Sequence, residues 1–219
     1  MLFDDRADAG RQLAQSLAQW RERADVIVLG IPRGGVIVAA EIARDLSAPL
    51  DVIICHKLGA PGNSELAIGA VAADGTLYLN DEIVEELRIP HSFIERERHE
   101  QLREIKRREE LYRQGRPPRA VEGQVVILVD DGIATGATTI AALRALRHQH
   151  PARLVLAVPV APAVMAQPLA AECDEIVILS MPESFAAVGW FYDHFDQVTD
   201  EQVVEALTSY SSPLGGEVR

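Results

Sequence analysis

Short runs of almost purely apolar residues recur along the chain, and amphipathic segments separate them. Such runs, bounded by turn residues, predict strands buried on both faces, as in a parallel sheet. We expect strands at 26–30, 51–55, 125–129, 154–159 and 175–179. Apolar residues at helical spacing predict helices at 4–20, 36–46, 138–149 and 162–171. This alternation predicts an α/β fold in which helices flank a parallel, twisted sheet.

The segment from 57 to 115 breaks this alternation. Residues 59–64 hold glycine, proline and asparagine and predict a loop. The Asp74-Gly75 pair between two apolar stretches predicts a tight hairpin at the edge of the sheet. Residues 93–114 contain seven Lys or Arg and six Glu, which favours an exposed helix with i,i+4 ion pairs. A nucleic-acid-binding helix is the alternative, and the near balance of charge argues against it.

The length of 219 residues suits one α/β domain with a small accessory region. We expect a single domain over residues 1–208, with a core at about 20–58 and 120–180, an insertion at 59–115 and a small hood at about 181–200. Residues 209–219 are rich in Ser, Gly and Pro and are predicted to be disordered.

Charge and cysteine content narrow the function classes. A net charge of −12 and a pI near 4.9 argue against a broad nucleic-acid or anionic-membrane surface, which needs clustered Lys and Arg. No apolar run approaches the length of a membrane span, and the N-terminus lacks an apolar signal core. Cys55 and Cys173 lie far apart in the sequence, so we expect neither a zinc site nor a disulfide framework, and a cytoplasmic location.

The segment 125–139 carries the strongest chemical signal. Its apolar strand ends in Asp130 and Asp131 at an exposed strand end, and ligands of open α/β sheets bind beyond the carboxyl ends of strands. The small residues of 134–138 let backbone N–H groups approach a phosphate, and the following helix adds its dipole. Two carboxylates beside a phosphate site suit the vicinal hydroxyls of ribose 5-phosphate. A metal site, a phospho-acceptor pocket and a purely structural turn are the alternatives.

Neither a Walker A loop nor a G-x-G-x-x-G fingerprint occurs in the sequence. The segment instead resembles the 5-phosphoribosyl-1-pyrophosphate (PRPP) motif of type I phosphoribosyltransferases: four apolar residues, two acids, then a small Thr/Gly loop. The match covers 13–15 contiguous residues, and a weaker resemblance runs from Asp4 to about Asp200. The chain is most similar to bacterial phosphoribosyltransferase-like proteins with a Pro-Arg-Gly-Gly turn and a Lys-x-Gly-Ala-Pro-Gly-Asn segment, here at 32–35 and 57–63.

The resemblance implies a glycosyltransferase of the pentosyl type that uses PRPP and Mg²⁺. It would transfer ribose 5-phosphate to a nitrogenous acceptor and release pyrophosphate, and it would act as a homodimer. A non-catalytic PRPP-binding regulatory protein is the main alternative, but we recognise in the sequence neither an added DNA-binding domain nor a basic RNA face. A domain that has lost or changed its catalytic activity is a third hypothesis.

The resemblance also implies roles for individual residues. Asp130 and Asp131 would bind the ribose hydroxyls, and the 5-phosphate would lie in a cradle formed by Ala134, Thr135, Gly136, Ala137, Thr138 and Thr139. The turn after the first strand would bind pyrophosphate through Arg33, Gly34 and Gly35, and members of the family often have a non-proline cis peptide there. A purely structural βα turn is the alternative. Lys57, at the end of the second predicted strand, would neutralise the leaving group, and an ordinary exposed lysine is the alternative. It completes a catalytic set of Asp130, Asp131, Lys57 and Arg33. The loop at 59–64 would be a mobile lid.

Residues near the C-terminus are the candidates for the acceptor side. By the same resemblance, Trp190, Phe191 and Tyr192 would stack on a flat acceptor base, and Asp193 would contact the metal. A small hydrophobic hood core is the alternative for the aromatic residues. Purine-salvage members commonly carry an aspartate where this chain has Ala134, so the acceptor stays open.

Overall fold

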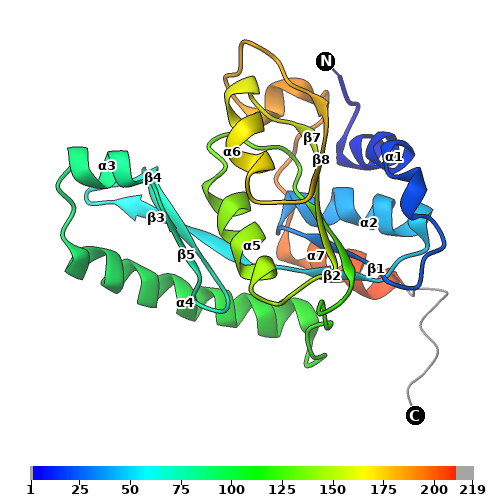
Figure 1. Cartoon of the computed structure of the whole chain (residues 1–219), viewed down its shortest axis with the longest axis horizontal. Helices are drawn as coiled ribbons and strands as arrows, with labels where there is room; N and C mark the ends of the chain where they lie inside the picture. The colour runs from blue at the N-terminus through cyan, green and yellow to red at the C-terminus, as the bar shows by residue number, and fades with distance from the viewer. Residues whose placement is uncertain (1, 211–219) are drawn as a thin grey trace.

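The structure is a computed structural model that describes residues 2–210, apart from the side chain of Glu65. A five-stranded sheet with the order β2-β1-β6-β7-β8 forms its centre (Figure 1). All neighbouring strands in this sheet are parallel, as the buried apolar runs predict. The strands are β1 (Val26–Gly30), β2 (Leu50–Val52), β6 (Val125–Val129), β7 (Arg153–Val160) and β8 (Glu175–Ser180).

Helices cover both faces of this sheet, so the chain has the expected α/β architecture (Figure 1). Alternate residues of β1 divide between two apolar clusters: Val28 faces one cluster and Leu29 faces the other. The first cluster is closed by α1 (Arg6–Ser16), α2 (Gly34–Leu46) and α7 (Asp200–Ser209). The second cluster is closed by α5 (Ala137–Arg147) and α6 (Ala166–Ala170).

A three-stranded antiparallel sheet with two helices extends to one side of this body (Figure 1). It comprises β3 (Cys55–Ala60), β4 (Asn63–Ala72), β5 (Leu77–Leu79), α3 (Asp81–Glu86) and α4 (His91–Arg113). The hairpin predicted at Asp74-Gly75 joins β4 to β5, and Gly75 has the positive φ of 86° that a tight turn requires. Helix α4 has the predicted charged surface, with ion pairs such as Arg107 to Glu104.

Several boundaries differ from the predictions. The strand expected at 51–55 is wrong, because β2 ends at Val52 and Cys55 already begins β3. Ile53 and Ile54 are apolar because the chain crosses there between two buried surfaces. The loop expected at 59–64 is largely strand, with only Pro61 and Gly62 between β3 and β4.

Four further differences concern helices. The helix expected at 4–20 ends at Ser16 and is followed by a 3-10 turn, η1 (Ala18–Trp20). The helix expected at 162–171 is divided into η2 (Ala163–Met165) and α6. A third 3-10 turn, η3 (Val188–Phe191), lies in the predicted hood, and α3 and α7 were not predicted. Helix α7 includes Ser209, and the rest of the predicted tail from 211 onward lies outside the described residues.

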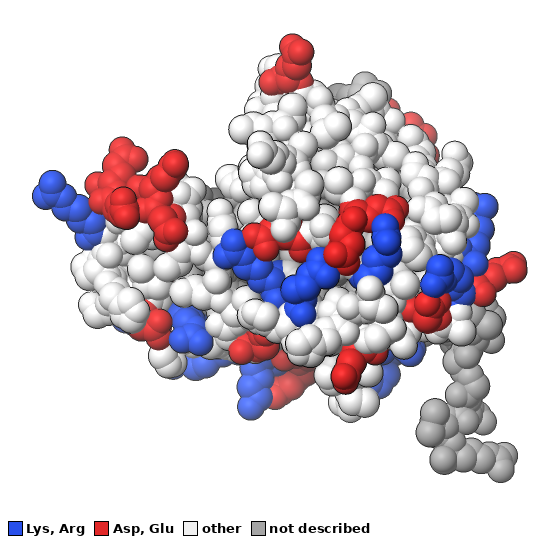
Figure 2. Space-filling model, viewed as in Figure 1, with Lys and Arg blue, Asp and Glu red and all other residues white. Residues whose placement is uncertain are grey.

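Charged side chains of both signs lie on the face of the molecule drawn in Figure 2. On the face drawn in Figure 2, acidic residues gather over α3, and elsewhere basic and acidic side chains are interspersed. The region around α6 is almost uncharged in this view. Within residues 2–210, no helix combines the length and the apolar character needed to cross a bilayer.

Candidate functional site

Two loops meet at the carboxyl edge of the central sheet. Strands β1 and β6 are parallel neighbours, and their last residues, Gly30 and Val129, are paired. The Ile31 N–H donates to the Val129 carbonyl at 2.9 Å, which continues the pairing by one residue. The loops that follow, residues 31–35 and 130–136, are therefore adjacent at the edge where open α/β sheets bind ligands.

The acid pair lies at the centre of this edge. Asp130 is half-buried, and its Oδ1 accepts the Asp131 N–H at 2.9 Å. Burial raises the pKa of the Asp130 carboxyl well above its ordinary value, and the neighbouring Asp131 carboxylate raises it further. Thr139 Oγ1 donates to Asp130 Oδ2 at a long 3.5 Å. The first acid is thus attached to the start of α5, and not freely exposed as the sequence suggested.

Asp131 is held from three sides, and the sequence indicated none of them. Its Oδ2 accepts the Arg6 Nε–H at 2.7 Å, and the Arg6 and Asp131 side chains are only 11% and 17% exposed. Its backbone carbonyl accepts the Tyr192 hydroxyl at 2.6 Å. Gly34 lies against it so closely that a Cβ there would overlap Asp131 Oδ2. The side chain is therefore fixed in one position by helices α1 and α2 and the hood.

The loop after the acids forms the wall of a small cavity. The cavity has a volume of about 160 Å³ and is lined by Asp130 and residues 132–139. Helix α5 begins at Ala137, after Gly136 with φ of 75°. Within the described chain, the backbone N–H groups of residues 134–139 have no hydrogen-bond acceptor. Unpaired N–H groups at a helix start favour an anion, in the positions that the sequence led us to expect.

The neighbouring loop presents a second set of N–H groups. The Pro32–Arg33 peptide is cis, as the resemblance led us to expect. No acceptor in the described part of the chain pairs with the N–H groups of residues 33–35. Gly35 touches the other acid, because a Cβ there would lie 2.9 Å from the Asp130 Cα. Both glycines are therefore needed for the packing of the two loops, whatever they bind.

A larger cavity of about 480 Å³ opens beside the acids and shares Asp130 with the smaller one. Its walls include Arg33, which forms a long 3.8 Å ion pair with Asp200, and two residues that the sequence did not single out, Arg6 and Phe195. The Arg6 guanidinium lies 3.8 Å over the Phe195 ring, and its Nη1 donates to the Asp196 carbonyl at 2.8 Å. No local pattern marks Arg6, which is 125 positions from Asp131.

The aromatic residues predicted for the acceptor separate into two kinds. Tyr192 is 1% exposed and packs on Phe3 and Phe195, so its ring is not presented to a ligand. Tyr192 is therefore not positioned to stack on an acceptor base, contrary to the prediction; its hydroxyl instead supports the Asp131 backbone carbonyl. Trp190 is 71% exposed, and Phe191 is half-buried with its ring stacked on Phe185. Both rings, which belong to the hood, therefore keep solvent-accessible surface.

Two other predicted residues do not line either cavity. Asp193 is exposed, and its N–H donates to the Phe3 carbonyl at 2.9 Å. Lys57 lies on β3 opposite Ala70 of β4, with an exposed side chain. It belongs to the antiparallel sheet, and not to the end of a central strand as the sequence suggested.

The donor set suits a magnesium ion that is shared with a ligand. Among the described residues, no three His, Cys, Asp or Glu side chains are grouped to hold a metal by themselves. Mg²⁺ in phosphoryl sites usually takes one or two carboxylates, several waters and substrate oxygens. Asp130 and Asp131 are the carboxylates that line the larger cavity. The residues present therefore fit a metal that arrives with a polyphosphate.

Comparison with known proteins agrees with this geometry. The model of the phosphoribosyl transferase domain matches residues 3–193. Two Mycobacterium tuberculosis proteins, one from each of two strains and provisionally named phosphoribosyl transferases, are each 47% identical over 206 residues. The matches cover 94% of this chain but 46% of each relative, so the chain spans about half the length of these proteins. The crystal structure of TT1426 from Thermus thermophilus is 45% identical, with a TM-score of 0.80 over 96% of this chain and 100% of that one. This chain belongs to the phosphoribosyl transferase family.

Proposed function

We propose that the protein binds PRPP and transfers its ribose 5-phosphate to a nitrogenous acceptor, releasing pyrophosphate. The observation that supports this most directly is the arrangement of two sets of unpaired backbone N–H groups around one pair of carboxylates. PRPP has the complementary pattern, since it carries a phosphate and a pyrophosphate on either side of two ribose hydroxyls. Backbone N–H groups allow an acidic chain to hold such a polyanion without a basic surface.

Each group of the substrate has a proposed partner. The N–H groups and hydroxyls of residues 134–139 bind the 5-phosphate, with Thr135, Thr138 and Thr139 as hydroxyl donors. Asp130 and Asp131 accept hydrogen bonds from the ribose hydroxyls, and Arg6 holds Asp131 in place for this. The pyrophosphate lies against Arg33 and the N–H groups of Gly34 and Gly35. Lys57 contributes only if the antiparallel sheet moves toward this edge.

In the reaction, the bond from ribose C1 to the pyrophosphate oxygen breaks and the pyrophosphate leaves with the electron pair. The acceptor nitrogen forms the new bond to C1 from the opposite face, then gives up its proton. Mg²⁺, when bound, offsets the negative charge of the pyrophosphate. Arg33 and the loop N–H groups stabilise that charge as it develops, and the acids fix the ribose so that C1 faces the acceptor.

The acceptor would enter the larger cavity, beside the hood. Trp190 and Phe191 are the proposed stacking residues, because their rings keep exposed surface on the hood, although neither lines the cavity itself. Ala134 supplies no side chain for a base nitrogen, which disfavours a purine acceptor. We place the reaction in the cytoplasm, where the free thiols of Cys55 and Cys173 would stay reduced.

Calorimetry with PRPP and Mg²⁺ tests the binding step, and pyrophosphate release with a panel of bases and amines tests transfer. The double variant Asp130→Asn with Asp131→Asn should lose PRPP affinity. A control variant, Asp25→Asn with Asp45→Asn, removes the same charge from two surface ion pairs and should bind normally. Unchanged PRPP binding in the first variant would contradict the ribose assignment. Tight binding without pyrophosphate release from any acceptor would favour the non-catalytic regulatory reading.

A further inference from the structure

A third cavity lies away from the acid pair, where α4 ends and the chain returns to the central sheet. It has a volume of about 360 Å³ and is lined by the edge strand β2, the segment 116–119 and the end of α7. None of its lining residues lines the two cavities at the acid pair. We call it the arginine cavity, because Arg113, Arg116 and Arg119 all contribute to its walls.

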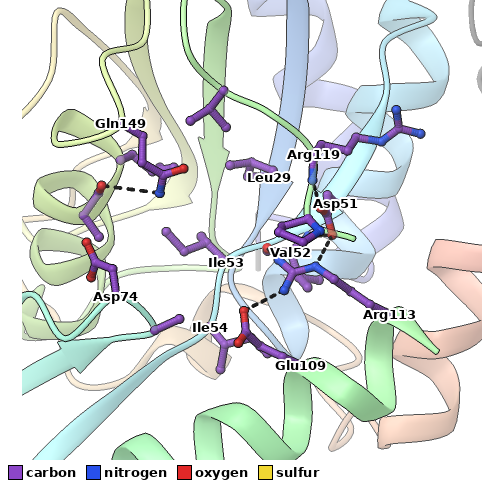
Figure 3. A pocket seen from close by; sticks show the side chains of 15 residues that line it. Leu29, Asp51, Val52, Ile53, Ile54, Asp74, Glu109, Arg113, Arg119 and Gln149 are labelled. Atoms are coloured by element: carbon purple, nitrogen blue, oxygen red, sulfur yellow. Dashed lines mark hydrogen bonds and ion pairs between the residues drawn. The ribbon is translucent and has the colours of Figure 1, made fainter. Parts of the chain in front are cut away.

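A buried ion pair forms the frame of the arginine cavity. Asp51 is 7% exposed, and its carboxylate accepts the Arg113 Nε–H at 3.2 Å and the Arg119 backbone N–H at 2.9 Å. Figure 3 draws these contacts from a neighbouring pocket, which shares Asp51, Arg113 and Arg119 with the arginine cavity. Arg113 also donates to Glu109 at 2.6 Å and to the Val52 carbonyl at 2.8 Å. The carboxylates of Asp51 and Glu109 are thus both occupied by Arg113. They are not available to the other two arginines.

Arg116 and Arg119 are therefore cations without a carboxylate partner in the described part of the chain. Both are exposed, and the only side-chain hydrogen bond of either is from Arg116 Nε to the Arg113 carbonyl at 3.1 Å. In Figure 3 the Arg119 side chain extends away from Leu29 and Ile53. In contrast, surface arginines such as Arg21 pair with a neighbouring acid. Two unpaired guanidinium groups beside a hollow make an anion site in an otherwise acidic protein.

The remaining walls are apolar and contain one aromatic ring. Leu50, Leu207, Pro117 and Pro118 line the cavity together with Tyr210, which is half-buried. The Tyr210 hydroxyl donates to the Ala43 carbonyl at 2.6 Å, so it is held and is not a free nucleophile. Burial raises the pKa of Tyr210, while the nearby charges of Arg44 and Arg119 oppose the shift. The ring therefore shares the wall of the cavity with Arg116 and Arg119.

We propose that the arginine cavity binds a nucleoside phosphate. Its phosphate would pair with Arg116 and Arg119, and its ring would lie against Tyr210 and the two prolines. A free inorganic anion would use only the arginines and leave the apolar walls bare. Among the described residues that line the cavity, Asp51 is paired with Arg113 and the Tyr210 hydroxyl is bonded to Ala43, so the cavity would bind the ligand without reacting with it. This inference goes beyond the proposed function and does not depend on it.

Isothermal titration calorimetry with nucleoside mono-, di- and triphosphates of the four common bases, and with inorganic phosphate alone, tests the proposal. The titrations use the wild-type chain with saturating PRPP and Mg²⁺, and the Asp130→Asn, Asp131→Asn chain without PRPP. Arg116→Gln with Arg119→Gln is the site variant. The control, Arg103→Gln with Lys106→Gln, removes two exposed cations of α4 that also lack carboxylate partners in the described chain. The site and control variants are made in both backgrounds, so nucleotide binding that persists in the site variant is assigned to the loop N–H groups at the acid pair and not to the arginine cavity.

We expect at least one nucleotide to bind the wild type and the control equally, and to lose about tenfold or more in affinity for the site variant. Its affinity should fall as salt is raised, and Arg116→Lys with Arg119→Lys should retain part of it. The inference is overturned if no nucleotide binds, if inorganic phosphate binds as well as the nucleotides, or if both glutamine variants behave alike. The heat of PRPP binding to the wild type is measured separately and tests the proposed function, so the two failures are distinguishable.

Discussion

Replacement of Arg6 by methionine is the sharpest test of how the site is built. Methionine keeps most of the length of the side chain but removes the guanidinium. Three contacts are lost: the 2.7 Å ion pair to Asp131, the 2.8 Å bond to the Asp196 carbonyl, and the 3.8 Å stacking on Phe195. Methionine can still pack on the ring, so the main change is electrostatic.

The expected cost follows from burial. Breaking a fully buried ion pair costs about 3–5 kcal/mol, because a charge is left without a partner. The Arg6 and Asp131 side chains are 11% and 17% exposed and border an open cavity, so water recovers part of that cost. The bond to the Asp196 carbonyl adds about 1.5 kcal/mol, and these contributions are not additive. We expect a loss of about 2–4 kcal/mol in the free energy of unfolding.

Urea denaturation and PRPP calorimetry provide the measurements. Arg11→Met on the same helix is the matched control, because Arg11 is 56% exposed and its ion pair with Asp8 is long, at 3.7 Å. This variant should lose less than about 1 kcal/mol in the free energy of unfolding. Arg6→Met should also weaken PRPP binding, because Asp131 is no longer fixed, and Asp131→Asn should cost less in the Arg6→Met background than alone. Equal stability and equal PRPP affinity in Arg6→Met and Arg11→Met would refute the reasoning.

Three further changes test other parts of the site. Gly34→Ala places a Cβ onto Asp131 Oδ2, so it should lower the free energy of unfolding by about 1–3 kcal/mol, despite the better helix propensity of alanine. It should also reduce PRPP affinity; denaturation and calorimetry measure the two effects. Asp130 has a raised pKa in the folded chain. Its contribution to the free energy of unfolding is therefore complete below its ordinary pKa of 3.8, and it is lost as pH rises toward the pKa of the folded state. Denaturation of Asp130→Asn across pH in magnesium-free buffer should lack that loss. Tyr192→Phe leaves the Asp131 carbonyl without its hydroxyl partner and should cost about 1–2 kcal/mol, whereas Tyr78→Phe, whose hydroxyl has no hydrogen bond in the described chain, should cost little.

The parts of the fold that the sequence predicted are those set by local pattern. The run 125–129 is buried on both faces, so nearly every position must be apolar, and β6 has the predicted bounds. The Asp74-Gly75 hairpin was predictable because a positive φ restricts the residue type. The same reasoning failed at Ile53 and Ile54, which are apolar although they belong to no strand. Ile53 still donates its N–H to the Gly30 carbonyl at 3.2 Å, but both residues cross between two cores and have the composition of a strand without its regular ladder.

The site was predictable where it is contiguous in sequence and not where it is assembled from distant segments. The acids and residues 134–139 form one stretch, so their order alone predicted that they lie together at one edge of the sheet. Arg6 comes from the first helix and reaches Asp131 only through the tertiary fold. Tyr192 was grouped with Trp190 because both are aromatic, yet one is buried and the other is 71% exposed. Residue type does not distinguish a ring that binds a ligand from a ring that supports a carboxylate.

The two glycines of the second loop join the fold to the proposed chemistry. In the proposed site, glycine at both positions gives a pyrophosphate access to the backbone N–H groups. The structure gives a second reason, because Gly34 and Gly35 touch the acid pair itself, with a Cβ at Gly35 only 2.8 Å from the Val129 carbonyl. The spacing between the two sets of N–H groups is therefore set by direct contact between the loops, and not by flexible side chains. A ligand with two anionic ends would meet partners already at a fixed separation, which lowers the entropic cost of binding. Replacement of either glycine by a larger residue should push the two loops apart and therefore weaken binding at both ends of the site together.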